Sequence, residues 1–317
     1  MEHTAAGPVR LLTRSEVRGL LHWPGLIESS AQALSAMAAG DLAVAESGQL
    51  RVPGASVHLK SGALVSQVVS VKANMRPDVG SSSGVVLAFD PVRFTLRAIL
   101  DSADITAMRT AAIAAVAARR LARPGDQIVA ILGLGPVGRH ALAALAQVLS
   151  IREVRLWSRD RQHADEVAAT LAGSVTVSQS AADAAAGADI VLTATPSREP
   201  LLADRDLGPR TRVLAMGADS RGKRELGEGV LTSAAVLADV LADALVVGEC
   251  AYLPAGADRA ACIELGDVLT GRRDLGDAGG RLVFDSVGSA VVDAAVTELV
   301  VAAAERLDIG TLVRLDA

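Results

Sequence analysis

The stretch that most constrains the fold runs from Asp126 to Gln147 and reads DQIVAILGLGPVGRHALAALAQ. It places a short apolar run, three glycines spaced G-x-G-x-x-G and an alanine-rich segment in direct succession. This order predicts a strand, a tight turn and a helix that together bind a dinucleotide. Gly133 permits the turn, Gly135 lets the backbone approach a pyrophosphate, and Gly138 allows close strand–helix packing. A glycine-rich turn with a purely structural role is the alternative. The predicted cofactor-binding residues here are Gly133, Gly135, Pro136, Val137 and Gly138.

The rest of segment 123–289 alternates apolar runs with helical patterns. The expected strands are QIVAIL, EVRLWS, SVTV, DIVLTAT, RVLAMG and AAVLAD. They are continuously apolar, as is typical of a parallel sheet covered on both faces. The pattern therefore predicts an α/β domain of the Rossmann type, with a doubly wound parallel sheet.

Residues 1–122 predict a separate α+β domain. EVRGLLHWPGLIESSAQALSAMAAG is expected to be helical on both sides of Pro24 and to stop at Gly40. ALVSQVVSVKA and GVVLAFD are expected to be strands, and DITAMRTAAIAAVAARRLA a long helix that ends before the Pro-Gly pair at 124–125. The helix in FDSVGSAVVDAAVTELVVAAAERL is too apolar to lie alone on a surface, so it is expected to pack on the first domain or to bridge the two domains. Residues 290–317 are assigned to the first domain.

Composition excludes several classes of partner. The net charge is −5, which argues against binding to nucleic acid or to an anionic membrane. No run of about 18 uncharged apolar residues predicts a membrane span. The two cysteines, Cys250 and Cys262, form no C-x-x-C pattern and indicate a reducing, cytoplasmic compartment. The five histidines have no metal-ligand spacing, so no metal is expected.

The end of the second strand of the Rossmann pattern favours one coenzyme. An NAD site usually places Asp or Glu there to bind the ribose 2′-hydroxyl. This chain has Ser158 and Arg159, which suit a 2′-phosphate, so NADP(H) is favoured over NAD(H). A shift of one or two residues would restore an acid in Asp160, but we expect Asp160 to cap a helix.

Several segments in the order found here resemble the ornithine cyclodeaminase/mu-crystallin family. They are DITAMRTAAIAAVAARRLARPGDQIVAILGLGPVGRHALAAL, REVRLWSRD, GADIVLTATPSREPLL, VLAMGADSRGKREL and FDSVGSAVVDAAV, across residues 75–310. The resemblance implies a Rossmann domain and a substrate domain that dimerises through its sheet and receives the C-terminal helix. It also implies hydride transfer at a small α-amino acid or its imine.

The same resemblance assigns roles to individual residues. Arg109, in TAMRTAA, resembles an arginine that holds the substrate carboxylate, and Asp219, in MGADSRG, resembles an acid that handles the substrate nitrogen. A solvated helix arginine and a turn-forming aspartate are the alternatives. Further residues resemble positions lining the cofactor, although structural turns would look similar: Thr195, Pro196, Met216, Ser286 and Gly288.

The chain departs from this family where a lysine usually lies beside the substrate. Alignment places Gln67 there, and a glutamine hydrogen-bonds but carries no charge. Lys72 lies five residues on, which in a continuous strand is the opposite face, so only a bulge would bring it round. Lys60 is a further candidate.

Two other positions complete the expected substrate site. Ser81 aligns with a small hydroxyl residue of the family, and Arg51 is the nearest candidate for a second arginine, although it falls about one strand late. Arg109, Gln67, Ser81 and Arg51 thus form the predicted substrate set, with Asp219, Arg109 and Gln67 as the catalytic set.

Three functions are compatible with these patterns. The first is a reductase or dehydrogenase that acts on a C=N or C–N bond and has a modified carboxylate pocket. The second is an ornithine or lysine cyclodeaminase. The third is a non-catalytic cofactor-binding protein in the manner of mu-crystallin. A small amine, imine or amino-acid-like substrate and a homodimer are expected.

Overall fold

The computed structural model describes residues 7–40, 42–44, 48–77, 82–275 and 279–315, in two compact units. The first unit is Met1–Arg109 with Ser289–Ala317, and the second is Thr110–Gly288. The sequence predicted the first boundary after residue 122, whereas the division lies inside helix α3 (Ala103–Leu121). The C-terminal end of this helix belongs to the second unit, where Arg212 donates a hydrogen bond to the Leu121 carbonyl at 2.8 Å.

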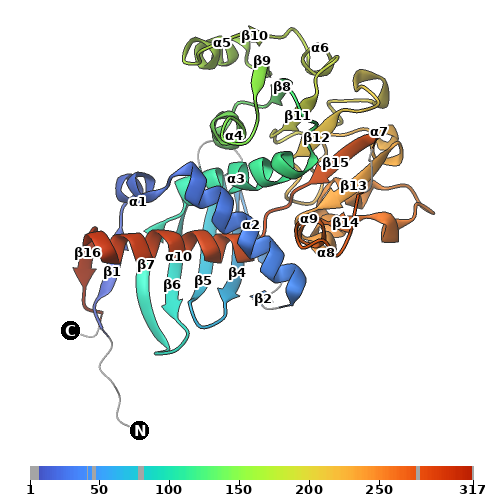
Figure 1. Cartoon of the computed structure of the whole chain (residues 1–317). Helices are drawn as coiled ribbons and strands as arrows, with labels where there is room; N and C mark the ends of the chain where they lie inside the picture. Colours follow the sequence, from blue (N-terminus) through green and yellow to red (C-terminus); the bar gives the residue numbers. More distant parts are fainter. Residues whose placement is uncertain (1–6, 41, 45–47, 78–81, 276–278, 316–317) are drawn as a thin grey trace. The chain divides into compact units, whose positions relative to one another are not determined.

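The first unit is a mainly antiparallel sheet with helices on one face. Strand order in the sheet is β16-β1-β7-β6-β5-β4-β2, and β3 pairs with β4. Helix α10 packs on β4, β5 and α2 of this unit. Figure 1 shows α10 crossing the strands of this sheet. Besides α3, the elements are β1 (Val9–Leu12), α1 (Arg14–Leu20), α2 (Trp23–Ala39), β2 (Leu42–Val44), β3 (Gly48–Val52), β4 (Ala55–Leu64), β5 (Val68–Pro77), β6 (Ser83–Asp90), β7 (Thr95–Asp101), α10 (Ala290–Leu307) and β16 (Thr311–Val313).

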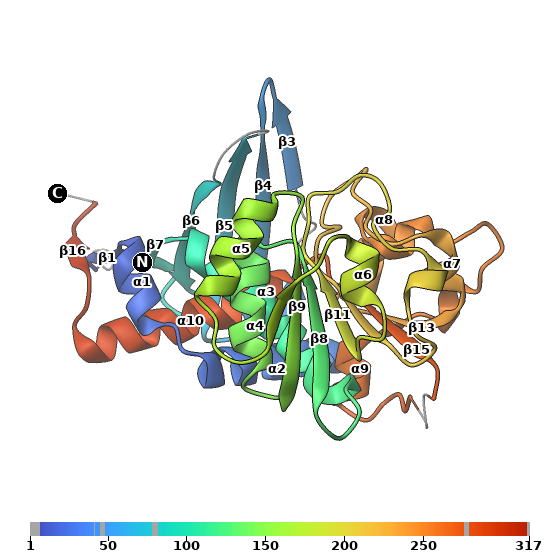
Figure 2. The same cartoon turned by 90° about the horizontal axis from the view of Figure 1, so that it is seen from above.

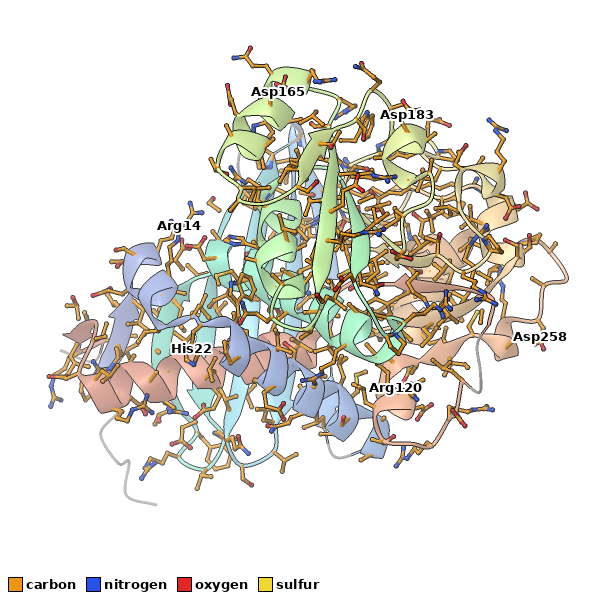
Figure 3. All side chains as sticks on the ribbon, turned by 45° about the horizontal axis from the view of Figure 1, so that its top comes forward. Arg14, His22, Arg120, Asp165, Asp183 and Asp258 are labelled. Carbon is orange, nitrogen blue, oxygen red and sulfur yellow. The ribbon has the colours of Figure 1, made fainter. Side chains whose placement is uncertain are left out.

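Local sequence signals place the first helices of this unit. Thr13 caps α1 in a capping box with Glu16, and α2 ends at Gly40, whose φ of +83° favours glycine. Arg14, which Figure 3 labels on α1, and Arg18 both donate to the buried Asp104 carboxylate at 2.9–3.2 Å. These bonds tie α1 to the start of α3.

One predicted strand is two strands in the structure. ALVSQVVSVKA was expected to be continuous, but Val65–Gln67 forms a turn in which Ser66 has a φ of +63°. Strands β4 and β5 therefore make an antiparallel hairpin in which Leu64 pairs with Val68 and Lys60 with Lys72. Face alternation cannot be counted across such a turn, and this changes the placement of Lys72.

The second unit confirms the predicted doubly wound parallel sheet. All its strand pairs are parallel, in the order β10-β9-β8-β11-β12-β15-β13-β14. Figure 2 shows α4 and α5 on one face of β8 and β9 and α6 on the opposite face. The elements after α3 are β8 (Gln127–Leu132), α4 (Pro136–Leu145), β9 (Ile151–Trp157), α5 (Arg161–Ala169), β10 (Val175–Val177), α6 (Ala181–Ala185), β11 (Ile190–Thr193), η1 (Asp204–Asp206), β12 (Arg212–Ala215), α7 (Glu228–Thr232), β13 (Ala234–Ala238), α8 (Leu241–Val247), η2 (Glu249–Tyr252), η3 (Arg259–Ala261), β14 (Ile263–Glu264), α9 (Leu265–Leu269) and β15 (Arg281–Asp285).

Strand order reverses between β8 and β11 in this sheet. From β8 the chain first builds outward to β9 and β10, and then returns to add β11 on the other side. In open α/β sheets such a reversal leaves a crevice at the carboxyl ends of the strands, where ligands bind. In the part of the chain that the structure describes, no helix has the length and apolarity that a membrane span requires.

Candidate cofactor and substrate sites

The glycine loop lies between β8 and α4, at the carboxyl end of the sheet. Gly133 has a φ of +97°, and a Cβ there would lie 2.6 Å from the Ala194 carbonyl oxygen, so only glycine fits. A Cβ on Gly135 would meet nothing within 4 Å. The protein itself therefore does not require glycine at position 135, whereas a ligand that approaches the backbone there would.

A cavity of about 150 Å³ opens at this loop. It is bounded by residues from the ends of three neighbouring strands: Gly133, Leu134, Gly135, Trp157, Ser158, Arg159, Ala194, Thr195, Pro196, Ser197 and Leu201. Gly135 is the residue before α4, so the amide groups that begin the helix lie at the cavity. Free amides and the positive end of a helix dipole suit a pyrophosphate, and the residues present therefore fit a dinucleotide.

The segment after β9 borders the same cavity. Ser158 and Arg159 line the cavity, and Arg159 is exposed. Asp160 caps α5 by accepting the His163 amide at 3.1 Å, so its predicted capping role is confirmed. His163 Nε2 lies within hydrogen-bond distance, 3.0 Å, of the Leu134 carbonyl oxygen. This contact ties α5 to the glycine loop.

The other predicted cofactor residues fall in two groups. Thr195 and Pro196 line the cavity beside the glycine loop. Met216 follows β12 and is buried, and Ser286 and Gly288 follow β15. None of these three residues is among those that line the cavity. The buried Asp239 accepts hydrogen bonds from the Ser286 hydroxyl and the Gly288 amide at 2.7 and 2.8 Å, which fixes that turn.

Asp219 lies in the loop that follows β12, at the same edge of the sheet. Its Oδ1 accepts a hydrogen bond from Lys223 Nζ at 2.7 Å, and both side chains are partly exposed. A carboxylate in this place can accept a proton from, or return one to, a substrate nitrogen. Within the described residues, no group of three or more His, Cys, Asp or Glu side chains is arranged to hold a metal ion.

Arg109, the predicted carboxylate ligand, belongs to a buried group of three charges in the first unit. Its Nε lies 2.8 Å from Asp293 Oδ1, and Lys72 Nζ pairs with Asp293 Oδ2. Lys72, Arg109 and Asp293 are 3%, 4% and 1% exposed. Two cations thus share one anion, and within the described part of the chain Arg109 Nη1 has no hydrogen-bond partner. We call Lys72, Arg109 and Asp293 the buried charge cluster; its net positive charge suits a ligand carboxylate.

The placement of Lys72 corrects the prediction for Gln67. Gln67 lies in the exposed turn between β4 and β5, where its carbonyl accepts a hydrogen bond from Arg97 at 3.3 Å. Gln67 is therefore not a strand residue, and the strand residue that shares Asp293 with Arg109 is Lys72. Because the turn interrupts the strand, Lys72 shares the helix-covered face of β5 with the buried Ser70 and Asn74 without any bulge.

The remaining substrate candidates are not brought to the cluster. Arg51 is exposed on β3 opposite Ser56, which lies four residues along β4 from Lys60, on the order of 13 Å. Lys60 is partly buried and pairs across the hairpin with Lys72. Ser81 lies outside the described residues. Sequence reasoning missed Asp293, although a lone carboxylate in the apolar run AVVDAAV was a signal that a buried cation would face it.

Burial sets the charge state of this cluster. Loss of hydration lowers the pKa of Lys72 to about 7, against the attraction of Asp293, and the charges of Arg109 and Lys60 lower it further. Burial raises the pKa of Asp293, but the adjacent Arg109 and Lys72 outweigh it and hold that pKa below its usual range. Asp293 is thus the ionised member on which both cations depend.

A second set of buried carboxylates stabilises the loops of the Rossmann unit. Glu249 accepts the amides of Glu225 and Leu226 at 2.6 and 3.2 Å, and Asp285 accepts the Cys250 amide at 2.8 Å. Burial raises the pKa of Glu249 to about 8 and that of Asp285 to about 7. Both carboxyl groups therefore keep their protons in the folded chain at pH values where the unfolded chain has released them.

This proton uptake predicts how stability depends on pH. Between pH 4.5 and about 8 the folded chain binds a proton at Glu249 that the unfolded chain has lost, so stability decreases as pH rises through this window. Glu249→Gln is expected to remove a few kcal/mol of that decrease. Urea unfolding of both proteins at pH 5.5, 7 and 8.5 measures it. An unchanged pH slope in the variant would contradict the assignment.

Comparisons with known proteins show the family of this chain and its fold. The model of the ornithine cyclodeaminase/mu-crystallin family matches residues 33–307. The ketimine reductase mu-crystallin of Mus musculus is 36% identical over 195 residues, which is 62% of this chain and 61% of the mouse protein. The chain thus matches less than two thirds of that relative's length.

Two solved structures extend the likeness over nearly the whole chain. A lysine cyclodeaminase has a TM-score of 0.88 at 27% identity, with 98% of this chain and 96% of the other covered. An archaeal alanine dehydrogenase dimer with bound NAD has a TM-score of 0.91 at 23% identity, with 97% and 99% covered, which shows a shared fold.

Proposed function

Since the chain belongs to the ornithine cyclodeaminase/mu-crystallin family, we propose that it is an NADP(H)-dependent oxidoreductase that reduces a carbon–nitrogen double bond in a small amino-acid-like substrate. The observation that carries this proposal is the cavity at the glycine loop, where Gly135 leaves room for a pyrophosphate. The 36% identity to a ketimine reductase supports a C=N substrate.

The chain's own residues supply the remaining chemistry. Reduction of a C=N bond adds a hydride to carbon and a proton to nitrogen, and a bound nicotinamide supplies the hydride. Asp219 holds the substrate nitrogen and passes the proton to it. Arg109, with the charge of Lys72 beside it, binds the substrate carboxylate. Two cations rather than one support a substrate whose carboxylate is free, instead of the altered carboxylate pocket that the Gln67 alignment implied.

Oxidation of NADPH in the presence of cyclic imines, and of pairs of 2-oxo acids and amines, tests this function. We expect coenzyme to be consumed in a fixed ratio to product, without release of ammonia. A cyclodeaminase would instead release ammonia from ornithine or lysine with only a trace of coenzyme. A non-catalytic binder would bind NADPH and turn over neither set of compounds.

The preference for NADP(H) is carried by Arg159. Its exposed guanidinium borders the cavity with Ser158, and Asp160 is engaged in capping α5. A charge-assisted hydrogen bond contributes about 1.5–3 kcal/mol, so Arg159→Ala is expected to weaken NADPH binding by roughly 10- to 100-fold and leave NADH unchanged. Coenzyme fluorescence titration measures both constants. Arg161→Ala, which removes an exposed arginine paired with Asp165, is the control; equal loss in both variants would contradict the prediction.

The homodimer is proposed to form through the outer face of the first unit's sheet. Alternation along β4, β5 and β6 places apolar residues on the face opposite α10, with Leu59, Met75 and Val85 about 40% exposed. An exposed apolar face of this kind marks an interaction site. The occupant we propose is a second copy, since a structure of the same fold is a dimer.

A charge on this face tests the dimer. A two-fold axis presents each substituted residue twice, so Val85→Lys is expected to shift the protein from dimer to monomer. Light scattering during size-exclusion chromatography gives the mass. Val92→Lys, which places the same charge in the exposed turn between β6 and β7, is the matched control and should stay dimeric. A dimeric Val85→Lys protein would place the interface elsewhere.

A further inference from the structure

Glu225 is a fully buried carboxylate that holds the ends of two neighbouring strands together. Its Oε1 accepts hydrogen bonds from the Thr195 amide and hydroxyl, each at 2.7 Å. Its Oε2 accepts the Thr193 hydroxyl at 2.7 Å and the Gly217 amide at 2.9 Å. Four donors thus converge on one side chain that has no exposure to solvent.

The partners of Glu225 belong to the two segments on which the proposed chemistry depends. Thr195 follows β11 and lines the cofactor cavity. Gly217 follows β12 and precedes Asp219 by two residues, in the same loop. Glu225 lies six residues beyond Asp219 in the same loop, and its carboxyl group joins the cavity-wall residue Thr195 to Gly217.

Thr195 packs closely against Gly133 of the glycine loop, so the positions of the two segments depend on each other. A Cβ on Gly133 would lie 2.7 Å from Thr195 Cγ2, so the two loops are in tight contact. A Cβ on Gly217 would lie 2.5 Å from the Thr195 carbonyl oxygen and would overlap the Glu225 carboxylate. A small displacement of any one segment therefore displaces the others.

The backbone of Glu225 is held as firmly as its side chain. Its amide donates to the buried Glu249 carboxyl group at 2.6 Å. Burial raises the pKa of Glu225, and the hydrogen bonds from Thr195, Thr193 and Gly217 oppose that rise by favouring the ionised form. An ionised carboxylate accepts at both oxygens, whereas an amide side chain accepts at one end and donates at the other. Two backbone N–H groups, those of Thr195 and Gly217, meet opposite oxygens of Glu225, so no orientation of a glutamine would satisfy both.

We propose that Glu225 is a positioning residue that sets the geometry of the cofactor cavity relative to the Asp219 loop. The inference rests on the proposed function, because it concerns the binding of a reduced coenzyme and the use of Asp219. Glu225 does not itself line the cavity, so it acts through Thr195 and Gly217.

The test compares coenzyme binding with stability in variants that remove these bonds singly. Thr193→Val deletes one hydroxyl to Glu225 at a buried site outside the cavity wall, and Thr193→Ser retains it. We expect Thr193→Val to raise the NADPH dissociation constant several-fold and Thr193→Ser to leave it unchanged. Glu225→Gln is expected to raise it at least tenfold and to lower kcat as well, since both loops shift.

Asp189→Asn supplies the matched control. Asp189 Oδ2 accepts the Ile128 amide at 2.9 Å at the amino edge of the same sheet, away from the cofactor cavity. This variant is expected to lower the melting temperature with no change in the coenzyme dissociation constant. If Thr193→Val and Glu225→Gln behave like it, losing only thermal stability, the positioning role is overturned.

The outcomes also separate this inference from the proposed function. Wild-type protein that binds neither NADPH nor NADH in a calorimetric titration would remove the proposed function and this inference with it. Wild-type protein that binds NADPH, together with variants that bind it equally well, would remove the positioning role alone. Should Glu225→Gln not fold, the Thr193 pair still decides, because it leaves the carboxylate in place.

Discussion

Asp219→Asn is expected to reduce turnover by about 10²- to 10⁴-fold while the dissociation constant for NADPH stays unchanged. Asparagine keeps the size and one hydrogen-bond acceptor of aspartate but cannot carry the proton that the substrate nitrogen gains. Asp219 also lies outside the residues that line the cofactor cavity, so its loss should not affect coenzyme binding.

Steady-state kinetics with a cyclic imine, combined with coenzyme titration, measures both effects. Lys223→Gln is the control, because it removes the ion-pair partner of Asp219 at 2.7 Å and retains the carboxylate. We expect a much smaller loss of turnover there. Equal turnover in Asp219→Asn and wild-type protein would show that another group handles the proton.

Asp293→Ala is expected to lower the free energy of unfolding by about 3–5 kcal/mol. The substitution leaves Lys72 and Arg109 buried beside each other without the carboxylate that pairs with both. Arg109 would remain a buried charge without its partner, and Lys72, whose pKa of about 7 is supported by Asp293, would give up its proton. An uncompensated buried charge is far more costly than a lost surface pair, and 3–5 kcal/mol is a large share of the 5–15 kcal/mol that stabilises an ordinary domain.

Urea unfolding at pH 7 measures the loss. Asp165→Ala is the matched control, since Asp165, labelled in Figure 3, is exposed on α5 and pairs with Arg161 at 3.3 Å. An exposed pair of this kind contributes about 0.3–0.5 kcal/mol. A loss at Asp293 no larger than that at Asp165 would mean that water reaches the cluster and screens it.

The buried charge cluster also explains why the substrate site was harder to predict than the cofactor site. Its three members come from β5, α3 and α10, and the last of these returns from the far end of the chain. The resemblance of TAMRTAA to a family motif identified Arg109. That motif contains no information on which charged side chains lie next to Arg109 in the fold. The position of Lys72 depended on a three-residue turn at Val65–Gln67, which an alignment of apolar residues does not detect.

The positioning role of Glu225 illustrates the same limit. In the sequence it is one acid within GKREL, next to basic residues and typical of an exposed turn. In the structure it is buried and accepts four hydrogen bonds from segments that precede it along the chain. Only the stacking of β11 beside β12 brings those donors together.

Local sequence patterns were enough to predict the doubly wound unit, the glycine loop and the Asp160 helix cap, because each pattern involves residues within a few positions of one another. Gly133 needs a positive φ, Asp160 caps the helix that begins next to it, and continuous apolar runs form strands buried on both faces. Which buried charges are paired depends instead on contacts between elements that are distant in the sequence. A buried charge is tolerated only where an opposite charge or several donors meet it, and the packing of distant elements creates those meetings.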